Sequence, residues 1–200
     1  VADLLQDRLR RYPEAITHLL AARDLDPGSE LIHERLVSLL GLTESWETLS
    51  ETLYAYIEQV RSEPQRLVVA RDRLARIREQ RLSDLTGAIA LYGDILGEDD
   101  EHDNALNAVE RLFEDPAVGH RVAPLLEPIY TRRGAWKKLI RVLETRAHAQ
   151  EHPADKIPWH ERIGELYEEK AENTRLAFEH RATVFSLDPS RVSSLEELER

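Results

Sequence analysis

The sequence has no cysteine, no methionine and few aromatic residues. Because cysteine is absent, neither a disulfide framework nor a thiolate metal site can form. Aromatic residues make up only 6% of the chain, so a buried core has to be built mainly from Leu, Ile, Val and Ala. No run approaches the roughly 18 consecutive apolar residues that a membrane-spanning helix needs. We therefore expect no membrane insertion. The sequence does not determine the cellular compartment, and we favour the cytoplasm.

Positive charge is also scarce. The chain has 27 Lys and Arg residues against 38 Asp and Glu residues, which gives a formal net charge of −11 at pH 7. Binding to a phosphate backbone requires a clustered excess of Lys and Arg, so nucleic acid is not expected as a partner. The absence of methionine even at position 1 predicts that the 200 residues are a fragment or a processed form of a longer chain.

Three segments of the sequence share a pattern. Each begins with alanine and a bulky apolar residue and ends twelve residues later at a proline or its equivalent: Ala15-Ile16 to Pro27, Ala88-Ile89 to Asp100, and Ala177-Phe178 to Pro189. The copies lie 73 and 89 residues apart, and the difference is about one helix. This difference predicts an extra helix around 118–132. A second motif, Trp46-x-x-Leu49-x-x-x-Leu53, recurs as Trp136-x-x-Leu139-x-x-x-Leu143.

Apolar residues recur with the helical period along the whole chain, as at Leu49, Leu53, Ile57 and Val60. Prolines and glycines interrupt this period where helices should end. The expected helices are 2–11, 14–25, 29–41, 45–61, 65–81, 84–97, 102–114, 118–132, 135–150, 156–172, 174–187 and 191–200. The short linkers favour antiparallel neighbours, and each hairpin must stack on the next to bury its apolar faces.

The segment 157–190 resembles the tetratricopeptide repeat, a pair of helices with a recurring Leu-Gly-x-x-Tyr, Ala and Pro pattern. Ile163-Gly164-x-x-Tyr167 matches the first helix, and Ala177 and Pro189 match the second. A side chain at position 164 is expected to hold the paired helix away. Arg181 departs from the pattern, since the family has an aromatic residue there.

The resemblance implies an all-α fold, an α-α superhelix described as a right-handed solenoid of antiparallel helical hairpins with about 11–12 helices. We predict a single solenoid domain over 1–200, and the structural alternative is a HEAT-like array. Leu195 and Leu198 begin an apolar stripe without a following hairpin, which again predicts a fragment of a longer repeat protein.

The family resemblance also implies a function, namely a scaffold that binds a partner protein or peptide through its repeat surface. The alternative is a helical regulatory or sensor domain of a larger enzyme or transcription regulator. The sequence contains no Gly-rich phosphate loop, nucleophile elbow or Ser/His/Asp grouping. We therefore predict no enzymatic activity, no catalytic residue and no cofactor.

The predicted partner-binding residues lie on the first helix of the best repeat. In this family, one face of that helix lines a concave groove that takes peptides. The matching positions follow the spacing i, i+4, i+7 and i+8 and are all acidic: Glu161, Glu165, Glu168 and Glu169. Four carboxylates on one wall favour a basic protein or peptide as the ligand. The alternative is an ordinary solvated helix face.

Two charged clusters have a functional and an ordinary interpretation. The helix expected at 65–81 carries Arg66, Arg71, Arg73, Arg76, Arg78 and Arg81. These arginines form either a basic patch for an acidic partner or, as we favour, a surface paired with acids on neighbouring helices. Asp99, Glu101 and Asp103 alternate like ligands of a calcium loop, but the central glycine of such a loop is missing. An acidic first helical turn is favoured there.

Histidines and tryptophans carry weaker signals. His148 and His152 are four residues apart, a spacing that can place two imidazoles on one metal ion, but no third ligand is evident. No metal site is therefore predicted. Trp46, Trp136 and Trp159 are expected to pack in the core or between hairpins.

Overall fold

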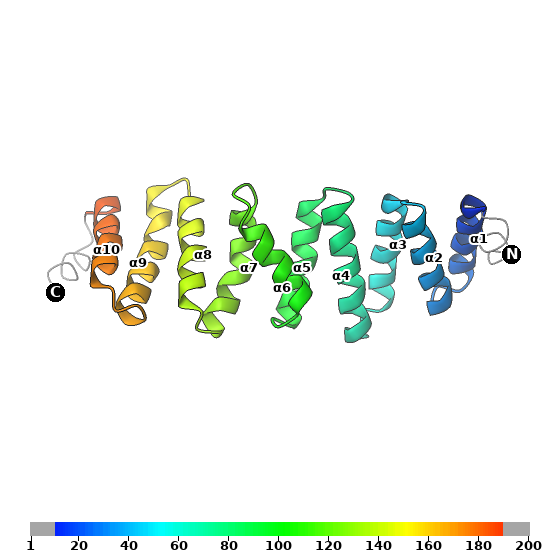
Figure 1. Cartoon of the computed structure of the whole chain (residues 1–200), viewed down its shortest axis with the longest axis horizontal. Helices are drawn as coiled ribbons and strands as arrows, with labels where there is room; N and C mark the ends of the chain where they lie inside the picture. The colour runs from blue at the N-terminus through cyan, green and yellow to red at the C-terminus, as the bar shows by residue number, and fades with distance from the viewer. Residues whose placement is uncertain (1–10, 190–200) are drawn as a thin grey trace. The chain divides into compact units, whose positions relative to one another are not determined.

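The computed structural model describes residues 11–189, and over this range it consists of ten α helices without a strand (Figure 1). The helices are α1 Tyr12–Leu25, α2 Glu30–Leu42, α3 Trp46–Gln59, α4 Pro64–Gln80, α5 Leu85–Glu98, α6 Asp103–Phe113, α7 Gly119–Arg132, α8 Trp136–His148, α9 Pro153–Glu169 and α10 Thr174–Leu187. The predicted all-α class is confirmed. No helix within 11–189 is long and apolar enough to cross a membrane.

Each of these helices starts and ends within three residues of its predicted bounds. Local signals favour helix starts at three of these places, because Pro13, Pro64 and Pro153 occupy first-turn positions, where a missing N–H costs nothing. The helices predicted at 2–11 and 191–200, and the apolar stripe at Leu195 and Leu198, lie outside the described residues. Ten of the predicted 11–12 helices are therefore found in the described part of the chain.

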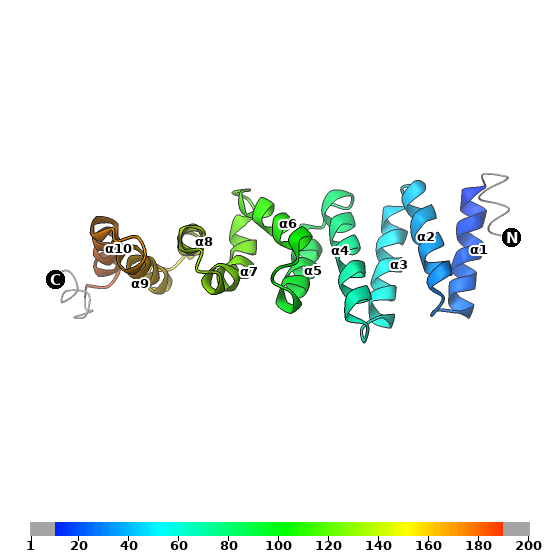
Figure 2. The ribbon, with the colours of Figure 1, turned by 60° about the horizontal axis from the view of Figure 1, so that its bottom comes forward.

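Helix packing divides the chain into two compact units, which are residues 1–105 (unit 1) and 106–200 (unit 2). In unit 1, α1 packs on α2, α2 on α3, α3 on α4 and α4 on α5. In unit 2, α7 packs on α8, α8 on α9 and α9 on α10. The same order of neighbours can be followed within each unit in Figures 1 and 2. This packing of chain neighbours confirms the helical-hairpin architecture, whereas a single solenoid domain over 1–200 stays a prediction.

The helices follow a five-helix pattern that occurs twice. Helices α6 to α10 start 89 to 91 residues after α1 to α5, as at Pro64 and Pro153, which begin α4 and α9. The unusual turns recur at the same interval. Glu44 and Gly134 have φ values of 52° and 62°, and Ser83 and Glu172 have φ values of 54° and 49°. Left-handed backbone at equivalent places shows that the two units close the same turns in the same way.

The buried positions recur as well. Buried residues of α2 have buried counterparts 90 residues later in α7: His33, Leu36, Leu39 and Leu40 match Ala123, Leu126, Ile129 and Tyr130. The small residues of the helix pairs also recur, with Ala15 matching Ala105 and Ala88 matching Ala177, each at most 1% exposed. The repeated core therefore lies at fixed positions of the five-helix pattern, although few of its residues are identical.

The five-helix pattern explains the unequal spacing of the alanine motif. Ala15 lies in α1, Ala88 in α5 and Ala177 in α10. The second interval therefore spans five helices and the first only four. The helix expected around 118–132 exists as α7. It is the counterpart of α2 and not an insertion, so the extra helix arises because the motif marks two different places in the pattern.

Gly164 packs less tightly than the sequence suggested. A Cβ added there would meet its nearest heavy atom, the carbonyl oxygen of Ala177, at 3.6 Å. This is an ordinary van der Waals contact. The equivalent residue of unit 1 is Ala75, which is fully buried. The expectation that any side chain at 164 would hold the paired helix away is therefore wrong for a methyl group.

Candidate functional site

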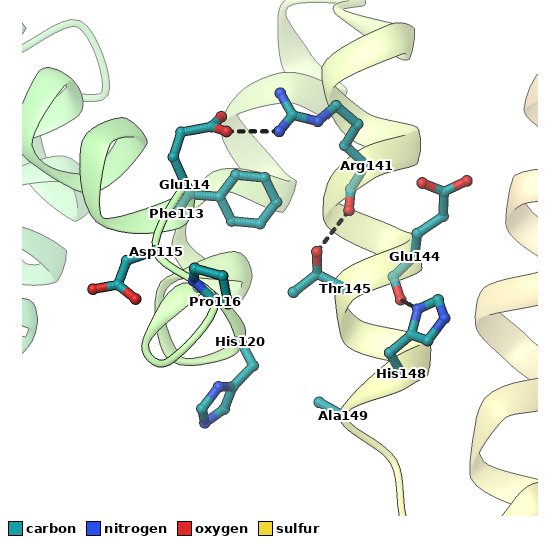
Figure 3. A pocket seen from close by; sticks show the side chains of 11 residues that line it. Phe113, Glu114, Asp115, Pro116, His120, Arg141, Glu144, Thr145, His148 and Ala149 are labelled. Carbon is teal, nitrogen blue, oxygen red and sulfur yellow. Dashed lines mark hydrogen bonds and ion pairs between the residues drawn. The ribbon is translucent and has the colours of Figure 1, made fainter.

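A hollow in unit 2 lies where the α6–α7 turn faces α8 (Figure 3). Its volume is about 510 Å³. A Cβ at Gly119 would approach the Phe113 carbonyl oxygen to 2.6 Å, so glycine is required for the tight turn that forms one wall. The Phe113 ring lies beneath the guanidinium of Arg141, which is 5.7 Å from the ring centroid.

Most polar groups that line this hollow already form hydrogen bonds or ion pairs (Figure 3). Arg141 donates to Glu114 at 2.8 Å, and the Thr145 hydroxyl donates to the Arg141 carbonyl at 2.9 Å. His148 Nδ1 donates to the Glu144 carbonyl at 2.7 Å. Burial raises the pKa of the Glu144 carboxyl, although His148 and Arg141 oppose this shift. The arrangement secures the α6–α7 turn, and the residues that line it include no nucleophile beside a base.

A smaller groove in unit 1 has a different character. It is formed by α2, α3 and α4, encloses about 220 Å³ and is called the α2–α4 groove below. Leu53 and Ala70, both buried, line it together with Val69, whose side chain is 58% exposed. Val69 therefore extends the apolar lining of the groove out to its edge.

Two aromatic rings form one side of the α2–α4 groove. The His33 and Tyr56 rings are stacked, with centroids 3.6 Å apart and planes 13° apart. Burial lowers the pKa of His33 to about 4, with a further lowering from Arg73 and Arg23 that Glu34 opposes. The imidazole is therefore neutral at physiological pH and acts as a flat, uncharged ring.

The edge of the groove is charged but balanced. Arg66 pairs with Glu30 at 2.8 Å, and Arg73 pairs with Glu34 at 2.9 Å, so each ion pair joins α4 to α2. The predicted pairing of the arginine-rich helix with neighbouring acids is confirmed here and at Arg71, which reaches Glu98 of α5 at 2.7 Å. Arg76 and Arg78 pair with Asp72 and Asp84, and Arg81 covers the ring of Trp46.

The four predicted partner-binding glutamates lie on α9, spaced as one helix face requires. Glu165, Glu168 and Glu169 are exposed, and Glu161 is half-buried. Glu165 accepts a hydrogen bond from Arg162 at 2.7 Å, and Glu168 is paired with Arg181 of α10. These pairs reduce the negative charge that the face offers. Its role as a partner-binding site stays a prediction.

The remaining sequence signals have ordinary structural roles. Within residues 11–189 no group of three or more His, Asp or Glu side chains could hold a metal ion. His148 ends α8 and His152 precedes α9. Asp99 accepts from the Glu101 N–H at 3.1 Å, and Asp103 lies in the first turn of α6, as the favoured interpretation predicted.

The tryptophans, predicted to pack in the core or between hairpins, are all half-buried, and Trp46 packs against the core of unit 1. A cation covers each ring, namely Arg81 over Trp46, Lys137 over Trp136 and Arg146 over Trp159. Tryptophan at the edge of the core, with a cation above the ring, combines apolar packing with an electrostatic contact.

No protein-family model and no curated protein matches this sequence. Solved structures of similar fold include the TPR2AB domain of yeast Sti1 in its pHSP90 complex, with 17% identity, a TM-score of 0.44 and coverage of 98% of this chain and 78% of that one. YrrB, described as a TPR protein with an unusual peptide-binding site, has 11% identity, a TM-score of 0.35 and coverage of 100% and 89%. The C-terminal part of a TPR repeat-containing protein from Cytophaga hutchinsonii has 14% identity, a TM-score of 0.40 and coverage of 100% and 98%.

All three of these proteins are described as tetratricopeptide-repeat proteins, the family that segment 157–190 of this chain resembles. Their TM-scores lie below 0.5, so they carry no further argument about this chain. In the described structure, Gly164 of α9 lies beside the Ala177 backbone of α10, the two residues that match the repeat pattern in the sequence.

Sequence reasoning missed two aromatic clusters. His33 and Tyr56 come from α2 and α3, and their stacking depends on the register between two helices. In unit 2, His160 and His180 share a hydrogen bond between their Nδ1 atoms at 3.0 Å, and Tyr167 stacks on His180. A buried position for His33 could have been found from its spacing to Leu36 and Leu40, three and seven residues on.

Proposed function

We propose that the chain is a protein-interaction scaffold and that the α2–α4 groove binds a peptide segment of a partner protein. The observation that carries the proposal is the arrangement of this groove. It has an apolar, aromatic interior with the exposed Val69 at its edge, surrounded by the Arg66–Glu30 and Arg73–Glu34 ion pairs. An apolar centre within a polar rim is the common composition of protein interfaces.

The groove suits a segment of a protein better than a small metabolite. Its volume of about 220 Å³ is below the range of about 300–1,000 Å³ typical of small-molecule pockets. The groove is open along one side of α4, where Gln65 and Val69 are both exposed. An extended chain can place one side chain in the groove and continue across the surface.

A second contact is proposed for the acidic face of α9. Glu165 and Glu169 are exposed, and the chain has a net charge of −11. Long-range electrostatic attraction by these carboxylates and by the negative net charge favours a basic segment and mainly raises the rate of association. The α9 face would then supply charge contacts to a basic segment of a partner protein.

A display library of random short peptides, selected on the immobilised chain, tests the proposed function. The peptides that bind are then measured against two variants. Val69→Asp places a charge in the groove at a position already 58% exposed, so folding should be unaffected. Leu42→Asp is the matched control, since Leu42 is 63% exposed and does not line the groove.

We expect the selected peptides to lose at least tenfold in affinity on Val69→Asp, because a buried, unpaired carboxylate costs more than about 1.4 kcal/mol. Leu42→Asp should change the affinity by less than about twofold. If both variants bind equally well, the groove is not the binding surface. If no peptide is enriched at all, the scaffold proposal for this chain is wrong.

A further inference from the structure

The two units fill one equivalent place in different ways. Positions 33, 56 and 70 of the α2–α4 groove correspond to positions 123, 146 and 159 of unit 2, at the 89- or 90-residue interval of the five-helix pattern. Unit 1 has histidine, tyrosine and alanine at these positions. Unit 2 has alanine, arginine and tryptophan. The largest side chain therefore comes from α9 in unit 2, whereas the corresponding residue of α4 is only a methyl group.

Unit 2 supplies its own aromatic side chain at this place. The Trp159 ring is covered by the guanidinium of Arg146, whose Cζ lies 4.0 Å from the ring centroid. Arg146 is also ion-paired with Glu127 of α7. An arginine that is paired to an acid can thus still cover an aromatic ring in this architecture.

Unit 1 leaves the same place open. Ala70 contributes no ring, and a hollow of about 220 Å³ lies beside it. The stacked rings of His33 and Tyr56 provide a flat aromatic surface, and Leu53 and Val69 provide aliphatic contacts. The neutral imidazole and the ion-paired rim add no net charge that would favour a charged ligand.

We infer that the α2–α4 groove takes an aromatic side chain, of tyrosine or tryptophan size, from a peptide segment of the partner protein, in the place that Trp159 fills in unit 2. The inference rests on the proposed function and narrows it to one class of residue. Aromatic contact with this ring pair favours an aromatic side chain over an aliphatic one of similar area. Arg66 and Arg73, which are paired with Glu30 and Glu34, can cover the incoming ring as Arg146 covers Trp159.

Other occupants would have less to gain. A lysine or glutamate side chain would lose its hydration against Leu53 and Ala70 without an unpaired counter-charge at the rim. A leucine would fill part of the volume but would forgo the stacking. A second copy of this chain could offer its own Phe178, which is 52% exposed. The experiment therefore has to distinguish self-association of the chain from binding of a partner peptide.

Three display libraries of otherwise random, non-aromatic peptides test the inference, with Trp, Leu or Ala fixed at the central position. The measured quantity is the fraction of each library retained by the immobilised chain. The Trp library should be retained about tenfold more than the Ala library and severalfold more than the Leu library. The preference should disappear on Val69→Asp and persist on Leu42→Asp.

A second variant, Ala70→Trp, gives the groove the residue that unit 2 already has. It should abolish retention of the Trp library, and circular dichroism confirms that the variant is folded. If Ala70→Trp does not fold, Val69→Asp alone tests whether retention of the peptides depends on the groove, because that substitution lies at an exposed position.

Each result separates the two proposals. Equal, groove-dependent retention of the Trp and Leu libraries would overturn the aromatic inference while the scaffold proposal stands. No retention of any library would overturn both. Concentration-dependent dimers in analytical ultracentrifugation that are lost in both Phe178→Ser and Val69→Asp would replace the peptide by a second copy, and this would also overturn the inference.

Discussion

The α4–α5 hairpin of unit 1 and the α9–α10 hairpin of unit 2 make the same contacts with different residues. Glu79 accepts a hydrogen bond from the Tyr92 hydroxyl at 2.9 Å, and its counterpart Glu168 is paired with Arg181. Position 181 is the one at which the sequence departs from the aromatic residue of the repeat family. Tyr92 supplies that aromatic residue in unit 1, whereas in unit 2 Arg181 takes its place as donor to the equivalent glutamate.

The equivalent residues Arg71 and His160 make different contacts, which should respond differently to conditions. In unit 1, Arg71 of α4 holds Glu98 of α5 at 2.7 Å. At the position of Arg71, unit 2 has His160, which hydrogen-bonds His180 of α10 at 3.0 Å. Both residues tie the first helix of their hairpin to the second, but the residue type determines whether salt or acid weakens the contact. Arginine stays charged at any relevant pH, whereas histidine titrates near neutrality.

The largest expected effect tests whether the two hairpin cores are equivalent. Leu74 and Ile163 occupy matching positions, and both are fully buried. Leu74→Ala and Ile163→Ala should each lower the free energy of unfolding by about 2–5 kcal/mol. Urea denaturation gives the total, and hydrogen exchange shows which unit has lost protection. A loss below about 1 kcal/mol at one of the two positions would contradict the equivalence.

His33 distinguishes unit 1 from unit 2, where Ala123 stands instead. Burial lowers the pKa of His33 to about 4, below its usual value of about 6.5. The unfolded chain therefore binds more protons between these values, so stability is constant above about pH 6.5 and falls as the pH falls through this window. The loss near pH 4 should be on the order of 2–3 kcal/mol.

Hydrogen exchange of α2 and α3 between pH 7.5 and 4 measures this loss. His33→Phe keeps a ring against Tyr56 but cannot titrate, so it should remove the part of the acid effect that is specific to these helices. If α2 and α3 lose the same protection in the unmodified chain and in the His33→Phe variant, His33 is not the group responsible.

A smaller acid effect is expected in the α9–α10 hairpin. Burial lowers the pKa of both His160 and His180, and the charge of His160 further lowers that of His180. The folded state again binds fewer protons, so the hairpin should lose stability as the pH falls below about 6.5. Amide exchange in α9 and α10 should speed up severalfold by pH 5, with little change in α4 and α5.

His180→Leu supplies the matched control, because the equivalent residue of α5 is Leu91. This variant should lose the acid response of α9 and α10 while staying folded at pH 7.5. High salt should have the opposite selectivity, since it weakens exposed ion pairs such as Arg71–Glu98. If acid speeds amide exchange equally in the α4–α5 and α9–α10 hairpins, the predicted difference between the two hairpins is wrong.

The smallest effect concerns Gly164 and its counterpart Ala75. A methyl group at position 164 meets only ordinary contacts, and glycine inside a helix is unfavourable by about 0.5–1 kcal/mol relative to alanine. Gly164→Ala should therefore raise the free energy of unfolding by about that amount. Thermal denaturation would detect it. A destabilised variant would mean that the α9–α10 contact is tighter than its unit 1 counterpart.

Helix positions could be predicted from the sequence because their signals are local. Pro64 and Pro153 fix helix starts, and the apolar period between them fixes the helix type. The groove could not be predicted, because it depends on residues of three helices coming into register. Ala70 looks like an unremarkable helix residue until its counterpart Trp159 is known. The acidic positions of α9 were found from the family pattern, and the pairing of Glu168 with Arg181 depends on packing of α10.

Because each helix packs mainly on its neighbours in the chain, the molecule should respond to mechanical tension in small steps. A force applied along the chain acts on all hairpins at once, and the weakest yields first, since the described helices of each unit share their main contacts with the helices next to them. Each hairpin can yield and re-form by itself, at a force set by its own interface. A partner seated across α2, α3 and α4 would fasten three helices together. Partner binding would then stiffen the α2–α4 segment, while the rest of the chain would still extend easily under force.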